Sequence, residues 1–225
     1  MIFDYNPYFK KYMTLVEAAD QVFEGMLKKY PDLVKCKIGC SDCCHALFDL
    51  TLIEAIYVNH QFNKKFEGLD KQEILEKANK VDRYIHRIKR KAYQALRSGR
   101  QEREILKDLA SESVRCPLLN EKDRCDLYEF RPLTCRFYGV PVAIGGEAHI
   151  CGKTGFLAGQ PYPTVKLDAI HRQLQEITAA LVRDINTQYI KLADLLVPLS
   201  MALLTVYDEQ YFGLEIPDKK ASSGK

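Results

Sequence analysis

The eight cysteines of this 225-residue chain fall into two dense groups. Four lie within nine residues and the other four follow after a long gap; they are Cys36, Cys40, Cys43 and Cys44, then Cys116, Cys125, Cys135 and Cys151. Thiolates are soft ligands that select zinc, iron–sulfur clusters or copper(I). We therefore expect the fold to bring both segments to one metal-binding region, with all eight cysteines as candidate ligands.

The number of cysteines exceeds what a single metal centre needs. One structural zinc ion or one [4Fe–4S] cluster takes about four thiolates. We favour an iron–sulfur cluster of the [4Fe–4S] type, with zinc or mononuclear iron as the alternative. The surplus thiols could serve a second metal or a redox-active pair, and the spacing does not assign the ligands.

Polar residues beside the cysteines could tune such a centre. Arg131 and Arg136 flank Cys135, where a guanidinium could lower a thiol pKa or hydrogen-bond a ligand sulfur. Tyr128 could donate a hydrogen bond to a ligand, and His45 directly follows the first cysteine group. We expect these four side chains to surround the ligands. No nucleophile with its base can be recognised from spacing, so we assign no catalytic residue.

The fixed residues around the cysteines resemble those of a known family. The matching elements are Cys40-x2-Cys43-Cys44, Cys116-Pro117 and Cys125-x2-Tyr128-x2-Arg131-Pro132-x2-Cys135-Arg136. Over residues 36–151 the chain is similar to the zinc- or iron-chelating cysteine-cluster proteins with a CxxCxxCC-type domain. The resemblance implies a metal or iron–sulfur site. A larger relative, flagellin lysine-N-methylase, carries a similar cysteine domain, which leaves S-adenosylmethionine-linked activity open.

Three functions of different classes are consistent with these residues. The first is an iron–sulfur protein with redox or S-adenosylmethionine-linked chemistry, which as an enzyme would be an oxidoreductase or methyltransferase-like. The second is a structural zinc module that serves in interactions. The third is a metal-handling protein that donates or buffers metal.

Two other interpretations of the cysteines are weaker. Cys36-x3-Cys40-x2-Cys43 has the spacing of the radical S-adenosylmethionine cluster loop, but Asp42 stands where that family usually has an aromatic residue. No alternation of strands and helices is expected after it. Disulfides are disfavoured because thiols stay reduced in the cytoplasm, and the adjacent Cys43 and Cys44 cannot easily bridge each other.

Composition indicates an ordinary globular protein. Hydrophobic residues make up 47% and charged residues 28%, and the formal net charge is +3. That charge is too small to indicate a nucleic-acid or membrane partner, so we expect a small-molecule or protein substrate. The N-terminal residues lack the basic and apolar regions of a signal peptide, and no apolar stretch is long enough to span a membrane. We expect a cytoplasmic protein.

The predicted fold is mainly α: one domain over residues 1–218, in which about six helices surround an irregular cysteine-rich region at 36–151. Apolar periodicity and capping signals place the helices at 8–30, 51–66, 70–97, 101–112, 164–184 and 187–209. Thr51 with Glu54 forms a capping-box pattern, and Asp70 is a candidate cap. One hairpin is expected, with strands at 139–144 and 147–151 joined at Gly145–Gly146. Residues 219–225 are predicted to be disordered.

Overall fold

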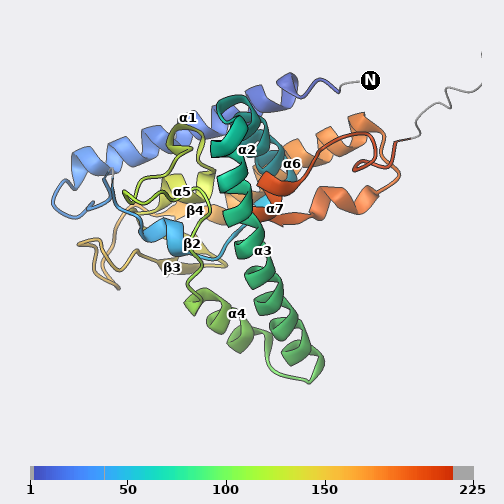
Figure 1. Cartoon of the computed structure of the whole chain (residues 1–225). Coiled ribbons are helices and arrows are strands. Elements are labelled where there is room, and N and C mark those ends of the chain that lie inside the picture. Colours follow the sequence, from blue (N-terminus) through green and yellow to red (C-terminus); the bar gives the residue numbers. More distant parts are fainter. Residues whose placement is uncertain (1–2, 38, 215–225) are drawn as a thin grey trace, which may run out of the picture.

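The computed structural model describes residues 3–37 and 39–214, and it confirms a mainly α-helical protein (Figure 1). The α-helices of this part are α1 (Asn6–Lys29), α2 (Leu52–Lys65), α3 (Gly68–Arg97), α4 (Glu102–Ser111), α5 (Leu133–Phe137), α6 (Leu167–Ile185) and α7 (Leu199–Leu204). The strands are β1 (Asp49–Thr51), β2 (Val142–Ile144), β3 (Glu147–His149), β4 (Val165–Lys166) and β5 (Leu196–Pro198). Single turns of 3-10 helix lie at Asp42–His45, Tyr128–Phe130 and Ile190–Asp194.

Helix α1 forms because its apolar residues recur every three to four positions and because Pro7 fits the first helical turn. Its buried face includes Tyr12, Ala19 and Met26, which pack in the largest core cluster against α2, α5 and α6. The helix ends at Lys29, just before Pro31, as predicted. This long helix therefore backs the region that carries the second cysteine group.

Helix α2 begins with the predicted capping box, in which Thr51 and Glu54 satisfy each other's backbone groups. Glu54 is buried, and its second oxygen, Oε1, accepts a hydrogen bond from the backbone N–H of Leu133 at 3.2 Å. Leu133 is the first residue of α5, the helix that contains Cys135. One carboxylate thus fixes the start of α2 and the position of a cysteine-bearing turn.

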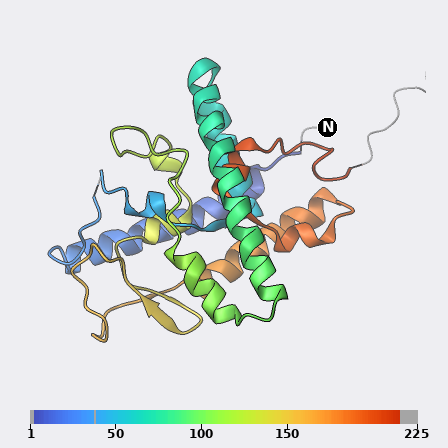
Figure 2. The ribbon, with the colours of Figure 1, turned by 60° about the horizontal axis from the view of Figure 1, so that its bottom comes forward.

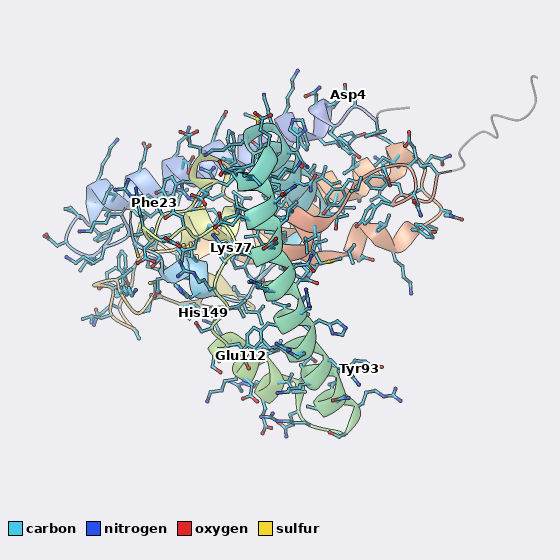
Figure 3. The ribbon with its side chains drawn as sticks, in the orientation of Figure 1. Asp4, Phe23, Lys77, Tyr93, Glu112 and His149 are labelled. Atoms are coloured by element: carbon cyan, nitrogen blue, oxygen red, sulfur yellow. The ribbon has the colours of Figure 1, made fainter. Side chains whose placement is uncertain are left out.

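The C-terminal half of α3 and helix α4 form an arm that extends from the body of the molecule (Figure 1). Tyr93, near the far end of α3, is 62% exposed (Figure 3). The prediction of Asp70 as the cap is wrong, because α3 starts at Gly68, whose φ of +56° suits glycine, and Asp70 lies in the first turn. The helix ends at Ser98–Gly99 as predicted.

The predicted hairpin is confirmed with shorter strands: β2 pairs with β3 around Gly145 and Gly146, which both have positive φ. The predicted helix over 187–209 is wrong. Residues 196–198 instead form β5, which pairs antiparallel with β1, and α7 begins after Pro198. Proline lacks the N–H that a continuous helix would need and disfavours helical backbone in the residue before it.

The two cysteine-bearing segments lie on one side of α3, and the described chain from the second half of α6 onward lies mainly on the other (Figures 1 and 2). The predicted tail at 219–225 lies outside the described residues, and the predicted single domain over 1–218 extends beyond them. Among the helices described, none is both long and apolar enough to cross a membrane.

Candidate metal centre

Backbone hydrogen bonds join the two cysteine segments. The N–H of Cys116 donates to the carbonyl of Cys44 at 2.7 Å, and the N–H of Val114 donates to the carbonyl of His45 at 2.8 Å. A β-bridge between Ala46 and Ser113 continues this pairing. Cysteines far apart in the sequence are therefore held side by side by main-chain bonds, which do not depend on any metal.

Five thiols form what we call the inner group: Cys43, Cys44, Cys116, Cys125 and Cys135. They line a cavity of about 340 Å³ together with Cys36 and Cys40. Phe23 of α1 lies beside the cysteine-bearing segments and lines the same cavity (Figure 3). Apolar side chains make up much of the remaining wall, among them Phe48, Val58, Leu118, Leu127 and Leu199.

The inner thiols contact one another in a chain. Hydrogen bonds with Cys135 and then Cys44 lower the pKa of Cys43. Hydrogen bonds with Cys116 and then Cys43 raise the pKa of Cys44, and the hydrogen bond with Cys43 raises the pKa of Cys135. Cys44 also contacts Cys116, and this hydrogen bond lowers the pKa of Cys116. Burial, followed by the neighbouring Cys116, raises the pKa of Cys125 to about 12. The inner thiols therefore lie close enough to influence one another's ionisation.

Backbone N–H groups point at three of the sulfurs. Leu118 and Leu119 donate to the thiol of Cys116, Leu127 donates to Cys125, and Lys153 donates to Cys151. In each case one donor lies two residues after the cysteine. Hydrogen bonds of this kind stabilise the charged form of a thiol, which is the form that binds metals.

Three cysteines form the outer group: Cys36, Cys40 and Cys151. With Asp42, Cys43 and Tyr138 they line a second, smaller cavity, which none of the other inner cysteines lines. Cys151 Sγ donates to Asp42 Oδ2 at 3.3 Å, and Lys153 Nζ lies 3.1 Å from Asp42 Oδ1. Burial, then the neighbouring Cys40 and Cys43, raises the pKa of Cys36 to about 11.

Gly139 allows Cys36 to approach the second segment. Its φ is +95°, and a Cβ at this position would lie only 2.5 Å from Cys36 Cβ. The preceding residue, Tyr138, lines both cavities, and burial followed by Cys43 and Asp42 raises its pKa to about 12. Sequence reasoning missed both residues; the signal available was their place directly after the Cys135–Arg136 motif.

Two of the four residues expected beside the ligands lie together at the site. The guanidinium of Arg131 stacks 4.0 Å from the ring centroid of Tyr128. After the hydrogen bonds with Cys135 and Cys44, its charge also lowers the pKa of Cys43, and it partly opposes the rise in the pKa of Cys36. His45 contacts the carbonyl of Ser41 through Nδ1 at 3.0 Å, next to the first cysteine group. The roles of these side chains toward a metal stay predictions.

Arg136 lines the large cavity but directs its donors at the protein. Its Nη1 contacts both carboxylate oxygens of Asp20 on α1, at 2.7 and 2.6 Å, and Nε donates to the carbonyl of Arg131 at 3.0 Å. Nη2 donates to the carbonyl of Glu129. Through these bonds Arg136 ties the turn after Cys135 to α1, and its predicted role toward a ligand sulfur stays a prediction.

The chemical types of these donors suit a metal ion bound by thiolates. All eight cysteines are free of disulfides, and Gly139 leaves the space that Cys36 occupies. Over residues 3–37 and 39–214, however, no three His, Cys, Asp or Glu side chains are already arranged to hold a metal ion. Metal binding therefore requires thiols that are neighbours in this structure to turn toward a common centre.

Comparison with protein-family models identifies the family of this chain. Residues 35–152 match the CxxCxxCC family, described as a putative zinc- or iron-chelating domain. Neither curated proteins nor solved structures yield a match to the chain. The matched span includes all eight cysteines and covers more than half of the 225 residues. The family description supports metal binding in general, and the chain belongs to the CxxCxxCC family.

Proposed function

We propose that this protein holds an iron–sulfur cluster on thiolates of the inner group. The observation that carries the proposal is the convergence of five thiols from both segments on one cavity. A donor set made only of sulfur favours zinc or iron–sulfur clusters over hard cations, and a cubane cluster takes about four cysteines. The inner group supplies that number with one thiol in excess.

Charge at the cavity supports the same proposal. A doubly charged core with four thiolates leaves a net charge of about −2, which needs nearby positive charge or N–H donors. Arg131 provides a cation that already lowers the pKa of Cys43, and backbone N–H groups reach Cys116 and Cys125. These groups would stabilise the bound thiolates and influence the reduction potential of a cluster.

Anaerobic purification tests the proposal. We expect a brown protein with about four iron and four acid-labile sulfide per chain. Cys116→Ser should remove most of this iron, whereas Cys151→Ser, a matched loss of a thiol outside the inner group, should retain it. Colourless wild-type protein that contains zinc without sulfide would overturn the proposal and favour the structural zinc module instead.

We place an enzymatic role, a redox or S-adenosylmethionine-linked reaction, at the same cavity. Its volume of about 340 Å³ lies within the range of small-molecule sites, and its wall is largely apolar. When bound, an iron–sulfur cluster would supply one-electron chemistry. Adding S-adenosylmethionine to the reduced protein should change the electron paramagnetic resonance spectrum if the cofactor binds there, and an unchanged spectrum would argue against that part of the proposal.

A further inference from the structure

We propose that the outer group forms a second metal site, separate from the inner cluster, for a single zinc or ferrous ion. Its ligands would be the thiolates of Cys36, Cys40 and Cys151 with the carboxylate of Asp42. This inference goes beyond the inner cluster and does not depend on whether that centre holds iron–sulfur or zinc. It assigns a metal-binding role to the cysteines that a single inner centre would not use.

The first argument is the division of the thiols between two cavities. Cys151 lines only the smaller cavity, and Cys44, Cys116, Cys125 and Cys135 line only the larger one. Cys36, Cys40 and Cys43 line both and therefore form the boundary. An ion bound in the smaller cavity would not face the other four inner thiols. Cys151 and those four thiols would therefore belong to different centres.

The second argument is that three separate segments are fixed at the smaller cavity. The N–H of Cys40 donates to the carbonyl of Lys37 at 2.8 Å, which closes the turn between the first two outer cysteines. The N–H of Gly155 donates to the carbonyl of Leu33 at 2.8 Å, which places the loop after Cys151 against the chain before Cys36. Long-range contacts, rather than sequence proximity, thus bring Cys151 to this loop.

Gly139 supplies the third segment. A Cβ there would lie 2.5 Å from Cys36 Cβ, so only glycine lets the chain pass this close to the thiol. The position also has a positive φ of +95°, which other residues rarely adopt. The fold therefore holds Cys36 against the turn after α5, within the electrostatic reach of Cys40 and Cys151.

The ligand chemistry differs from that of the inner group. Asp42 Oδ2 lies 3.3 Å from Cys151 Sγ, so a carboxylate stands beside the thiols. Zinc accepts both thiolate and carboxylate ligands, and ferrous iron accepts the same types. Three thiolates and one carboxylate around a divalent ion leave a charge of about −2. Lys153, 3.1 Å from Asp42, offers a compensating cation.

Solvent reaches the outer site through its polar residues. The side chains of Asp42 and Lys153 are 37% and 61% exposed, whereas Cys44 of the inner group is buried. Because solvent reaches one side of the site, we expect its metal to exchange faster than the inner one. Binding would require the thiols to turn together, since no three donors among the described residues are arranged for it beforehand.

Cobalt(II) titration of anaerobically purified protein tests this inference. We expect wild type to bind about one Co(II) per chain at the outer group, with a thiolate-to-cobalt charge-transfer band, while the inner iron and sulfide stay unchanged. Cys151→Ser should lose that band and keep the inner metal. Asp42→Asn should weaken Co(II) binding about tenfold or more and, because its side chain is partly exposed, should retain the fold.

Three outcomes would overturn the second site. Cys151→Ser could bind Co(II) as wild type does, or it could lose the inner iron in step with the outer metal, as expected of one shared centre. Asp42→Asn could bind with unchanged affinity, which would remove the carboxylate from the ligand set. Circular dichroism of each variant checks the fold, and Asp42→Asn decides the matter if Cys151→Ser misfolds. Zinc in place of iron and sulfide at the inner group would refute the proposed iron–sulfur cluster. The second site would still be tested in that case, because the number of metal ions per chain distinguishes one centre from two.

Discussion

Replacing Gly139 by alanine is the sharpest test of how the fold presents Cys36. The substitution adds one methyl group and changes no charge or thiol. Gly139 has a φ of +95°, and the added Cβ would lie 2.5 Å from Cys36 Cβ and 3.6 Å from its Sγ. Either the backbone of the turn must change its conformation, or Cys36 must move away from Cys40 and Cys151.

The magnitude follows from two separate costs. A side chain held at this positive φ costs roughly 1–3 kcal/mol. Carbon atoms in contact normally stand about 3.5–4.0 Å apart, and inserting a methyl group into a packed site costs about 1–3 kcal/mol. Together these predict that Gly139→Ala lowers the free energy of unfolding by roughly 2–6 kcal/mol, a large part of the usual stability of about 5–15 kcal/mol.

Gly99→Ala is the matched control. Gly99 has a similar φ of +88° at the end of α3, but a Cβ added there would meet no atom within 4 Å beyond its chain neighbours. It should therefore show the backbone cost alone, and any gain from a stiffer unfolded chain is common to both variants. The difference between the two variants, about 1–3 kcal/mol, measures the contact with Cys36.

Urea unfolding of chelator-treated protein measures the free energies of unfolding, and the thiolate-to-cobalt charge-transfer band of anaerobically purified protein measures the metal at the outer group. We expect Gly139→Ala to lose outer metal as well as stability, and Gly99→Ala to lose only stability. Equal free energies of unfolding for the two variants, together with full outer metal in Gly139→Ala, would refute the argument that this glycine makes room for the thiol.

Three further predictions concern the supports of the site. Arg136→Ala should lower the free energy of unfolding, measured in urea, by about 2–4 kcal/mol, because it leaves a carboxylate of α1 and two carbonyls without their donor. The control Arg97→Ala, on the arm, should change that free energy by no more than about 0.5 kcal/mol. Glu54→Ala should cost about 1–3 kcal/mol because two helix starts lose their acceptor, and Glu73→Ala, an exposed helical control, should cost far less; similar losses would contradict the shared role of Glu54. Saturating zinc should raise the melting temperature of metal-free wild type clearly more than that of Cys116→Ser, and equal shifts in differential scanning fluorimetry would place the metal elsewhere.

Local patterns in the sequence predicted most of the helices and the type of chemistry. The capping box at Thr51, the helix end at Ser98 and the hairpin turn at Gly145–Gly146 each depend on a few adjacent residues, and each is confirmed. The cysteine motif is local in the same sense, because short loops carry several thiols. Such features can be found without knowing which distant segments meet.

The sequence did not reveal the features that depend on long-range contacts. The main-chain bond between Cys116 and Cys44 joins segments separated by three helices, and no spacing predicts it. Arg136 follows a cysteine directly, which suggested a role toward the metal, yet its partner is Asp20 on α1. The predicted helix over 187–209 was wrong for the same reason, because pairing of β5 with β1 outweighs the helical periodicity around Pro198.

The arrangement of the thiols argues against a single structural zinc ion. Such an ion needs about four ligands, which the inner group supplies from two segments joined by main-chain bonds. A chain that needed only this ion would gain nothing from a glycine that packs against Cys36 or from a carboxylate beside Cys151. Glycine in such a position costs backbone entropy on folding, so its contact with a thiol is best explained by a use for that thiol. The proposed second centre would provide that use, and it would separate the inner metal from one that exchanges with solvent.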